Sequence, residues 1–293
     1  MRRKRGIPSA GWLGTGPFAL VSVLFFVSTA GCGSKVTPEQ RQSTPTSTPM
    51  STVTSIQLSK TPPLSTPWTS KVSQTNPWPE YPRPQLTRPD WQNLNGPWRF
   101  ASAASLVTPP TGQTLSSTVL VPFPIESALS GIMQHQDYMW YRRTFQVPSS
   151  WSGRNVQLNF GAVNWQTKVY VNGSQVGTHS GAYDSFSFDI TSALKSGDNE
   201  LIVGVFSPVD GASAPFPIPI GKQRLSPGGI YYTPSSGIWQ TVWIEPTNAA
   251  HITRLDTTPD VPAGVLDIVV QGAGIPGQVA HRRALDAVTS ETT

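Results

Sequence analysis

The chain has 293 residues, a formal net charge of +5, 29 prolines, 25 glycines and ten tryptophans, and only 13% charged residues. Many turn residues and aromatic side chains favour an all-β protein over a helical one. The net charge comes from the first few residues, because basic and acidic residues are equal in number from Trp78 to Thr247. A neutral folded part lacks the basic footprint of a nucleic-acid-binding protein, so we expect no nucleic-acid partner.

Cysteine and histidine usage argues against a metal or an organic cofactor. Cys32 is the only cysteine of the chain, which excludes an internal disulfide and a multi-cysteine zinc site. The four histidines are scattered without ligand spacing. We therefore expect no cofactor.

Residues 1–32 have the features of an export signal. A basic start is followed by an apolar run, residues 18–27, which is too short to span a membrane comfortably, and then by small residues. The end of this segment, Ser28 to Cys32, resembles the lipobox of bacterial lipoproteins, in which the cysteine is lipidated; Thr29 departs from that pattern. The resemblance implies an exported protein, anchored through several acyl chains at the cell surface or in the periplasm. An ordinary signal peptide with an incidental Cys32 is the alternative.

Residues 33–77 form a predicted linker. The segment is rich in Ser, Thr and Pro and has no apolar periodicity. Its prolines oppose regular hydrogen-bonded ladders, so we expect a disordered, solvated tether between the anchor and the first folded domain.

Residues 78–247 carry the pattern of an antiparallel β-sandwich. Apolar residues alternate with polar ones in short runs, and turn signals such as Asn172-Gly173 separate these runs. At about 170 residues such a domain buries a sufficient core by itself. The residues expected to alternate toward one face are Val156, Leu158 and Phe160; Val169 and Val171; Phe186, Phe188 and Ile190; Leu201, Val203 and Val205; and Trp239, Thr241 and Trp243.

Three motifs make this region similar to a known family. Residues 91–100 (WQNLNGPWRF), 121–127 (VPFPIES) and 140–145 (WYRRTF) resemble the opening strands and loops of glycoside hydrolase family 2, the β-galactosidase and β-glucuronidase group. The resemblance implies a jelly-roll antiparallel β-sandwich, galactose-binding-domain-like, whose partner is a carbohydrate, either a β-glycoside or a glycan.

The segment from Ser207 to Tyr232 is the best candidate for a sugar-binding loop. It is long, irregular and rich in Pro and Gly, and long loops in compact domains are often functional. Sugars are held by aromatic faces and by planar polar groups. In the family the corresponding loop reaches the substrate, and an acidic residue lies about six positions before a Ser-Gly glycine; here that position is Tyr231. The alternative is a loop that only packs against a neighbouring domain. The candidate substrate-binding residues are Asp210, Lys222, Gln223, Tyr231 and Tyr232.

Other aromatic and acidic residues of the domain are given structural roles. Four tryptophans in strand patterns are expected to pack in the core, whereas Trp165 and Tyr183 lie nearer to loops. The Asn199-Glu200 pair looks like the catalytic Asn-Glu of the family but lies in a turn before a strand, so we reject it as catalytic. Asp184 and Asp189 flank a strand and do not form the carboxylate pair of a retaining hydrolase. The tryptophans assigned to packing are Trp98, Trp140, Trp239 and Trp243.

Residues 248–293 are expected to hold an incomplete domain. Residues 251–272 show two strand patterns around a Pro-Ala-Gly turn and resemble the start of the immunoglobulin-like domain that follows the sandwich in the family. Such a domain needs about seven strands. After about Gly277 the composition changes and no β alternation is visible. A frameshift or premature stop is the expectation here.

The resulting hypothesis is the N-terminal sugar-binding portion of an exported family 2 glycoside hydrolase, β-galactosidase-like. The family resemblance implies retaining hydrolysis of O-glycosyl bonds by two glutamates on a downstream barrel, so this portion alone is expected to be non-catalytic, with no catalytic residue of its own. The alternatives are a surface glycan-binding lipoprotein without catalysis and a purely structural product. A sandwich fold serves many functions and does not choose among them. The sugar, the linkage and the oligomeric state stay open.

Overall fold

The computed structural model describes residues 60–210 and 218–274, and the backbone of residues 280–285. Of two compact units, residues 1–52 and 53–293, all described residues belong to the second. The predicted signal, the predicted lipidation site at Cys32 and residues 33–59 of the predicted linker lie outside the described residues. No helix among the described residues is long and apolar enough to cross a membrane.

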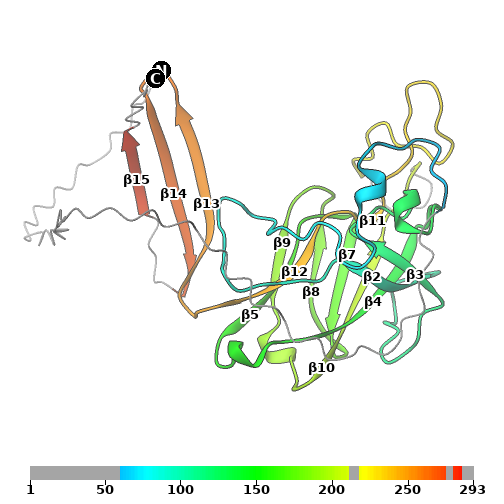
Figure 1. Ribbon diagram of the computed structural model, residues 1–293, viewed down its shortest axis with the longest axis horizontal. Helices are drawn as coiled ribbons and strands as arrows, with labels where there is room; N and C mark the ends of the chain where they lie inside the picture. Colours follow the sequence, from blue (N-terminus) through cyan, green and yellow to red (C-terminus); the bar gives the residue numbers. More distant parts are fainter. Residues whose placement is uncertain (1–59, 211–217, 275–279, 286–293) are drawn as a thin grey trace, which may run out of the picture. The chain divides into compact units, whose positions relative to one another are not determined.

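Two antiparallel sheets form a β-sandwich, as the strand periodicity predicted (Figure 1). One sheet has the strand order β1-β12-β5-β9 and the other β3-β2-β4-β10-β7-β8. The strands of the first sheet are β1 (Gln92–Asn93), β5 (Asn155–Phe160), β9 (Phe186–Asp189) and β12 (Val242–Thr247). The strands of the second are β2 (Gly96–Ser102), β3 (Ser117–Val121), β4 (Tyr138–Gln146), β7 (Gln166–Val171), β8 (Ser174–Ser180) and β10 (Asp198–Phe206).

Short elements connect these strands. Two strands of two residues each, β6 (Val163–Asn164) and β11 (Gly237–Ile238), pair with each other. Four single-turn 3-10 helices lie in the connections of the described residues: η1 (Thr69–Lys71), η2 (Ala128–Ser130), η3 (Ser149–Trp151) and η4 (Thr191–Ala193).

The core lies between the two sheets and is built by the alternation read from the sequence. Val156, Leu158 and Phe160 of β5 face Val203 and its neighbours from β10, and all are buried. Strands β7 and β8 are joined by the predicted tight turn at Asn172-Gly173, where both residues have positive φ, 51° and 84°. Positive φ at both central residues is the type I′ geometry that suits a twisted hairpin.

The last predicted strand faces differently from the expectation. Strand β12 begins at Val242, so Val242 and Ile244 point into the core, while Trp243 points to the outer face. Trp239 lies outside the regular strands and is half-buried. Trp243 is nevertheless only 2% exposed, because Tyr81 packs edge-on against its ring. The predicted packing role holds for Trp98, Trp140 and Trp243, which are all buried.

The folded part begins earlier than predicted. Residues 60–77 were expected to belong to the solvated tether, yet Val72 packs against buried Leu120 and Phe123, and Lys60 donates a hydrogen bond to the Ile132 carbonyl at 2.6 Å. The Asn95 side chain donates to the Pro77 carbonyl at 3.1 Å. Residues 60–77 are therefore held against the domain by individual side-chain contacts. Such contacts produce no periodic pattern in the sequence, so the sequence did not predict them.

A separate antiparallel sheet follows the sandwich in the chain. It has the order β13-β14-β15, with β13 (His251–Asp260), β14 (Val265–Ala273) and β15 (Ala280–Leu285). The first two strands match the predicted pair around the Pro-Ala-Gly turn. The third corrects the expectation of no β structure after Gly277: Ala280–Leu285 pairs with Val265–Val270. Backbone pairing joins this strand to the sheet, and such pairing leaves no signal in the sequence.

Candidate functional site

One long loop leaves the sandwich after β10 and returns at β11, and it contains all the predicted sugar-binding residues. Its described parts are residues 207–210 and 218–236. The backbone N–H of Ser207 donates to the Asp137 carbonyl at 2.8 Å. At the other end the N–H of Ser236 donates to Glu126 Oε2 at 2.9 Å. Both ends of the loop are thus attached to the segment that precedes β4.

Asp210 and Tyr231 are brought together by a residue that the sequence-based site omitted. Arg224 lies with its Nε 3.6 Å from Asp210 Oδ1 and with its guanidinium carbon 4.7 Å from the centre of the Tyr231 ring. Asp210 also accepts a hydrogen bond from the Leu225 N–H at 2.9 Å. This contact chain fixes the inner part of the loop and leaves Tyr231 41% exposed.

The remaining predicted residues divide into one that holds the loop and two that face outward. The Gln223 amide accepts from the Ser235 N–H at 2.7 Å and donates to the Ile220 carbonyl at 3.0 Å, so it is engaged inside the loop. The Lys222 carbonyl accepts from the Tyr232 N–H at 2.9 Å, while both side chains are exposed. Tyr232 is 66% exposed.

A second exposed aromatic residue lies on a neighbouring loop. Tyr183, between β8 and β9, is 71% exposed, and its ring stands edge-on to Trp239 with 5.7 Å between ring centres. The Trp239 indole N–H donates to the Ala182 carbonyl at 2.8 Å, and the Gly181 N–H donates to the Trp165 carbonyl at 3.2 Å. These bonds attach the loop of Tyr183 to neighbouring parts of the sandwich.

The loops of Tyr183 and Tyr232 belong to the same end of the sandwich. The Asn164 side chain donates to the Ser235 carbonyl at 2.7 Å, and the Trp165 N–H donates to the Phe206 carbonyl at 3.3 Å. Residues 161–165 therefore connect the loop after β8 with both ends of the loop after β10. Exposed aromatic faces beside polar side chains are the chemistry that holds C–H patches and hydroxyl groups of sugars.

The Asn199-Glu200 pair is structural, as predicted. Asn199 is fully buried, and its amide makes hydrogen bonds of 2.8–3.1 Å to Lys195, Gly197 and Asn172. Glu200 forms an ion pair with Arg142. Together these contacts close the turn before β10.

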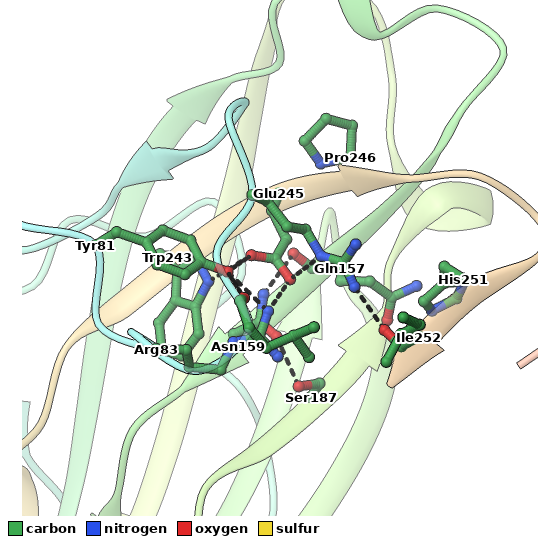
Figure 2. A network of polar contacts seen from close by, with 12 residues as sticks. Tyr81, Arg83, Gln157, Asn159, Ser187, Trp243, Glu245, Pro246, His251 and Ile252 are labelled. Carbon is green, nitrogen blue, oxygen red and sulfur yellow. Dashed lines mark hydrogen bonds and ion pairs between the residues drawn. The ribbon is translucent and has the colours of Figure 1, made fainter. Parts of the chain in front are cut away.

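A buried polar network occupies the outer face of the sheet β1-β12-β5-β9. Figure 2 shows Tyr81, Arg83 and Trp243 around the carboxylate of Glu245. Glu245 is 2% exposed at its side chain and also pairs with Arg88 at 3.0 Å. Burial opposes the charged carboxylate, but the hydrogen bond from Tyr81 and the charge of Arg83 leave the pKa of Glu245 below its usual value. Burial and the bond to Glu245 raise the pKa of Tyr81 to about 12.

These contacts attach the strap of residues 78–91 to the sandwich. They therefore explain why the strap folds against this sheet. Among the described residues no group of three or more His, Cys, Asp or Glu side chains is arranged to hold a metal ion.

The fold is an antiparallel β-sandwich, and comparison with known proteins identifies a family for part of it. Residues 110–214 match the model of the glycosyl hydrolases family 2, sugar binding domain. Residues 110–214 are thus similar to the sugar-binding domain of glycoside hydrolase family 2, the family that the sequence motifs predicted.

Similar proteins come from the same group. A beta-galactosidase of Thermoanaerobacter pseudethanolicus is 35% identical over 124 residues, covering 41% of this chain and 15% of the relative. A putative beta-glucuronidase of Formosa agariphila is 28% identical over 199 residues, covering 63% of this chain and 22% of the relative. The structure of Bifidobacterium dentium beta-glucuronidase complexed with coumarin-3-O-glucuronide has the same fold, with a TM-score of 0.50 and 22% identity. The match covers 64% of this chain and 37% of that chain. The chain spans less than a quarter of these two curated relatives.

Proposed function

We propose that the sandwich of residues 78–247 binds the sugar of a β-glycoside at the end formed by residues 161–165, 181–185 and the loop after β10. The main support for this proposal is that Tyr183 and Tyr232 are exposed on loops whose backbones are hydrogen-bonded to the sandwich. Exposed aromatic rings on rigid supports bind at low entropic cost because little motion is lost on contact.

We infer that the whole protein of which this domain is part hydrolyses O-glycosyl bonds, β-galactosidase-like in its chemistry. The family match and the names of the relatives support this reading. The described domain would contribute binding and not bond cleavage. Its paired carboxylates support that division, because Glu126, Glu200 and Glu245 each have a basic partner inside the fold.

Export and membrane anchoring through Cys32 complete the proposal. Their support is the sequence of residues 1–32 alone. Expression in a bacterial host with a labelled fatty acid tests the anchor: the wild-type chain is expected to take up label and sediment with membranes. Cys32→Ser is expected to lose both, and a labelled variant would exclude lipidation at Cys32.

Sugar binding is tested by calorimetry of the chain with β-galactosides and β-glucuronides. Tyr183→Ala and Tyr232→Ala are each expected to weaken binding about two- to tenfold, since an aromatic contact is worth about 0.5–1.5 kcal/mol. Tyr183→Phe keeps the ring and is expected to retain most of the affinity. Trp68→Ala is the matched control, because Trp68 is 68% exposed but lies outside these loops. Equal affinity of the wild type and both alanine variants would contradict the proposed site.

A further inference from the structure

A histidine lies between two carboxylates directly beneath the candidate sugar loop. His135 Nδ1 is 2.8 Å from Glu126 Oε1, and His135 Nε2 is 2.8 Å from Asp137 Oδ1. The Ser236 hydroxyl is 3.2 Å from the same Nδ1. The side chains are largely enclosed, with 14% of His135 and 5% of Glu126 exposed. Both ring nitrogens of His135 thus face carboxylate oxygens.

The two acidic residues that flank His135 also hold the two ends of the loop. The carbonyl of Asp137 accepts from the Ser207 N–H, where the loop begins. The carboxylate of Glu126 accepts from the Ser236 N–H, where the loop ends, and the Ile125 N–H donates to the Ser236 carbonyl at 3.3 Å. His135 therefore links both loop ends through one side chain.

We propose that protonated His135 is a positioning residue that clamps both ends of the loop. Sugar affinity then depends on the charge of His135, and this part rests on the proposed sugar-binding function. An imidazolium has two N–H donors, one for each carboxylate. A neutral imidazole has only one, and its other nitrogen then presents a lone pair to a carboxylate oxygen. Deprotonation therefore converts one of the two charge-assisted bonds into a repulsive contact.

The charged surroundings favour the protonated form. The groups that face the ring are Glu126 and Asp137, and Tyr141 from β4 lies within electrostatic reach of Glu126. Burial acts to lower the pKa of His135, but the bonds to Glu126 and Asp137 outweigh it and leave the pKa raised above 6.5. A raised pKa means that the clamp contributes fully below pH 6.5 and is lost as the pH rises through the higher value found in the folded protein.

Hydrogen exchange of the backbone at Ser207 and Ser236 tests the clamp without a sugar. In the full chain we expect protection of both amides, corrected for the intrinsic exchange rate, to fall about tenfold on raising the pH through the pKa of His135, because one charge-assisted bond is lost. His135→Gln, neutral at every pH, is expected to show the low protection throughout. His251→Gln is the matched control, since His251 contacts only the backbone of its own turn.

A second measurement, sugar affinity over the same pH range, separates the two proposals. Protection that changes with pH in the wild type but not in His135→Gln, together with an affinity that follows it, supports the clamp. Protection that changes while no sugar binds supports the clamp as a loop device and overturns the proposed function. Protection that is independent of pH in the wild type, or that changes equally in His135→Gln, overturns the clamp. If His135→Gln does not fold, Asp137→Asn replaces it, because it removes one charged acceptor and keeps the Asp137 carbonyl.

Discussion

Removal of the Glu245 carboxylate is expected to destabilise the sandwich more than any exposed substitution. Glu245 accepts hydrogen bonds from Tyr81 at 2.7 Å and from the Trp243 indole at 3.0 Å, and it pairs with both Arg83 and Arg88. Glu245→Ala would leave two partly buried guanidinium groups without their anion. Loss of one partner of a buried ion pair costs about 3–5 kcal/mol.

The size of this effect converts to a measurable change in melting temperature. For a domain of this size each kcal/mol lowers Tm by about 2–4 °C, so Glu245→Ala is expected to melt about 6–20 °C below the wild type. Glu245→Gln keeps the shape and part of the hydrogen bonding, and we expect it to lose about half as much, since bonds to charged groups are about twice as strong as neutral ones. Glu80→Ala removes an exposed carboxylate nearby and is the control.

The pH dependence gives an independent check. The pKa of Glu245 is lower in the folded protein than its usual 4.5, so its contribution to stability is complete above pH 4.5 and is lost as the pH falls through the lower folded value. Thermal melts followed by near-ultraviolet circular dichroism at several pH values are the assay. We expect the acid loss of stability to be smaller in Glu245→Gln. A loss under about 1 kcal/mol in Glu245→Ala, typical of exposed pairs, would refute the reasoning.

Two further substitutions test the packing and the turn. Gly204→Ala would place a Cβ 2.4 Å from the Trp140 ring, so we expect about 1–3 kcal/mol of destabilisation in urea unfolding. Gly228 has open space around it, so the stability of the control Gly228→Ala should stay within about 0.5 kcal/mol of the wild type. Equal stability of these two variants would mean that Trp140 moves freely. Asn199→Ala should lower the free energy of unfolding by about 3 kcal/mol, because the turn loses all the hydrogen bonds of the Asn199 amide. Under conditions in which this variant stays folded, its sugar affinity should equal that of the wild type. A selective loss of affinity would assign the Asn199-Glu200 pair a binding role.

The core strands could be predicted from the sequence because their information is local. Alternation in β5 and β10 places every second residue on one face, and the buried residues are those expected. The same reasoning failed at Trp243, because a strand buried on both faces has no polar side to identify its register. The covering residue, Tyr81, is far away in sequence, and no local pattern predicts where it packs.

The loop was identifiable by length and composition, but its internal contacts were not. Gln223 appeared as a sugar-binding amide, whereas the structure uses both of its polar atoms inside the loop. Arg224 was present in the same stretch but was omitted, although it connects Asp210 with Tyr231. Composition identifies polar residues but does not show which of them find partners when the chain folds.

The segments that hold the candidate site show why long-range polar pairing escapes sequence analysis. Ser236 lies about a hundred residues from His135 and Glu126 in the chain, and scattered histidines gave no ligand spacing. The strap of residues 78–91 likewise has no periodicity, yet Tyr81, Arg83 and Arg88 all bond to one glutamate on a distant strand. A polar residue buried among apolar neighbours demands partners wherever they lie in the chain, because an unpaired buried charge is costly. A lone Glu in the buried run of β12 was therefore the available signal for the strap, and two acidic residues flanking a single His were the signal for the clamp.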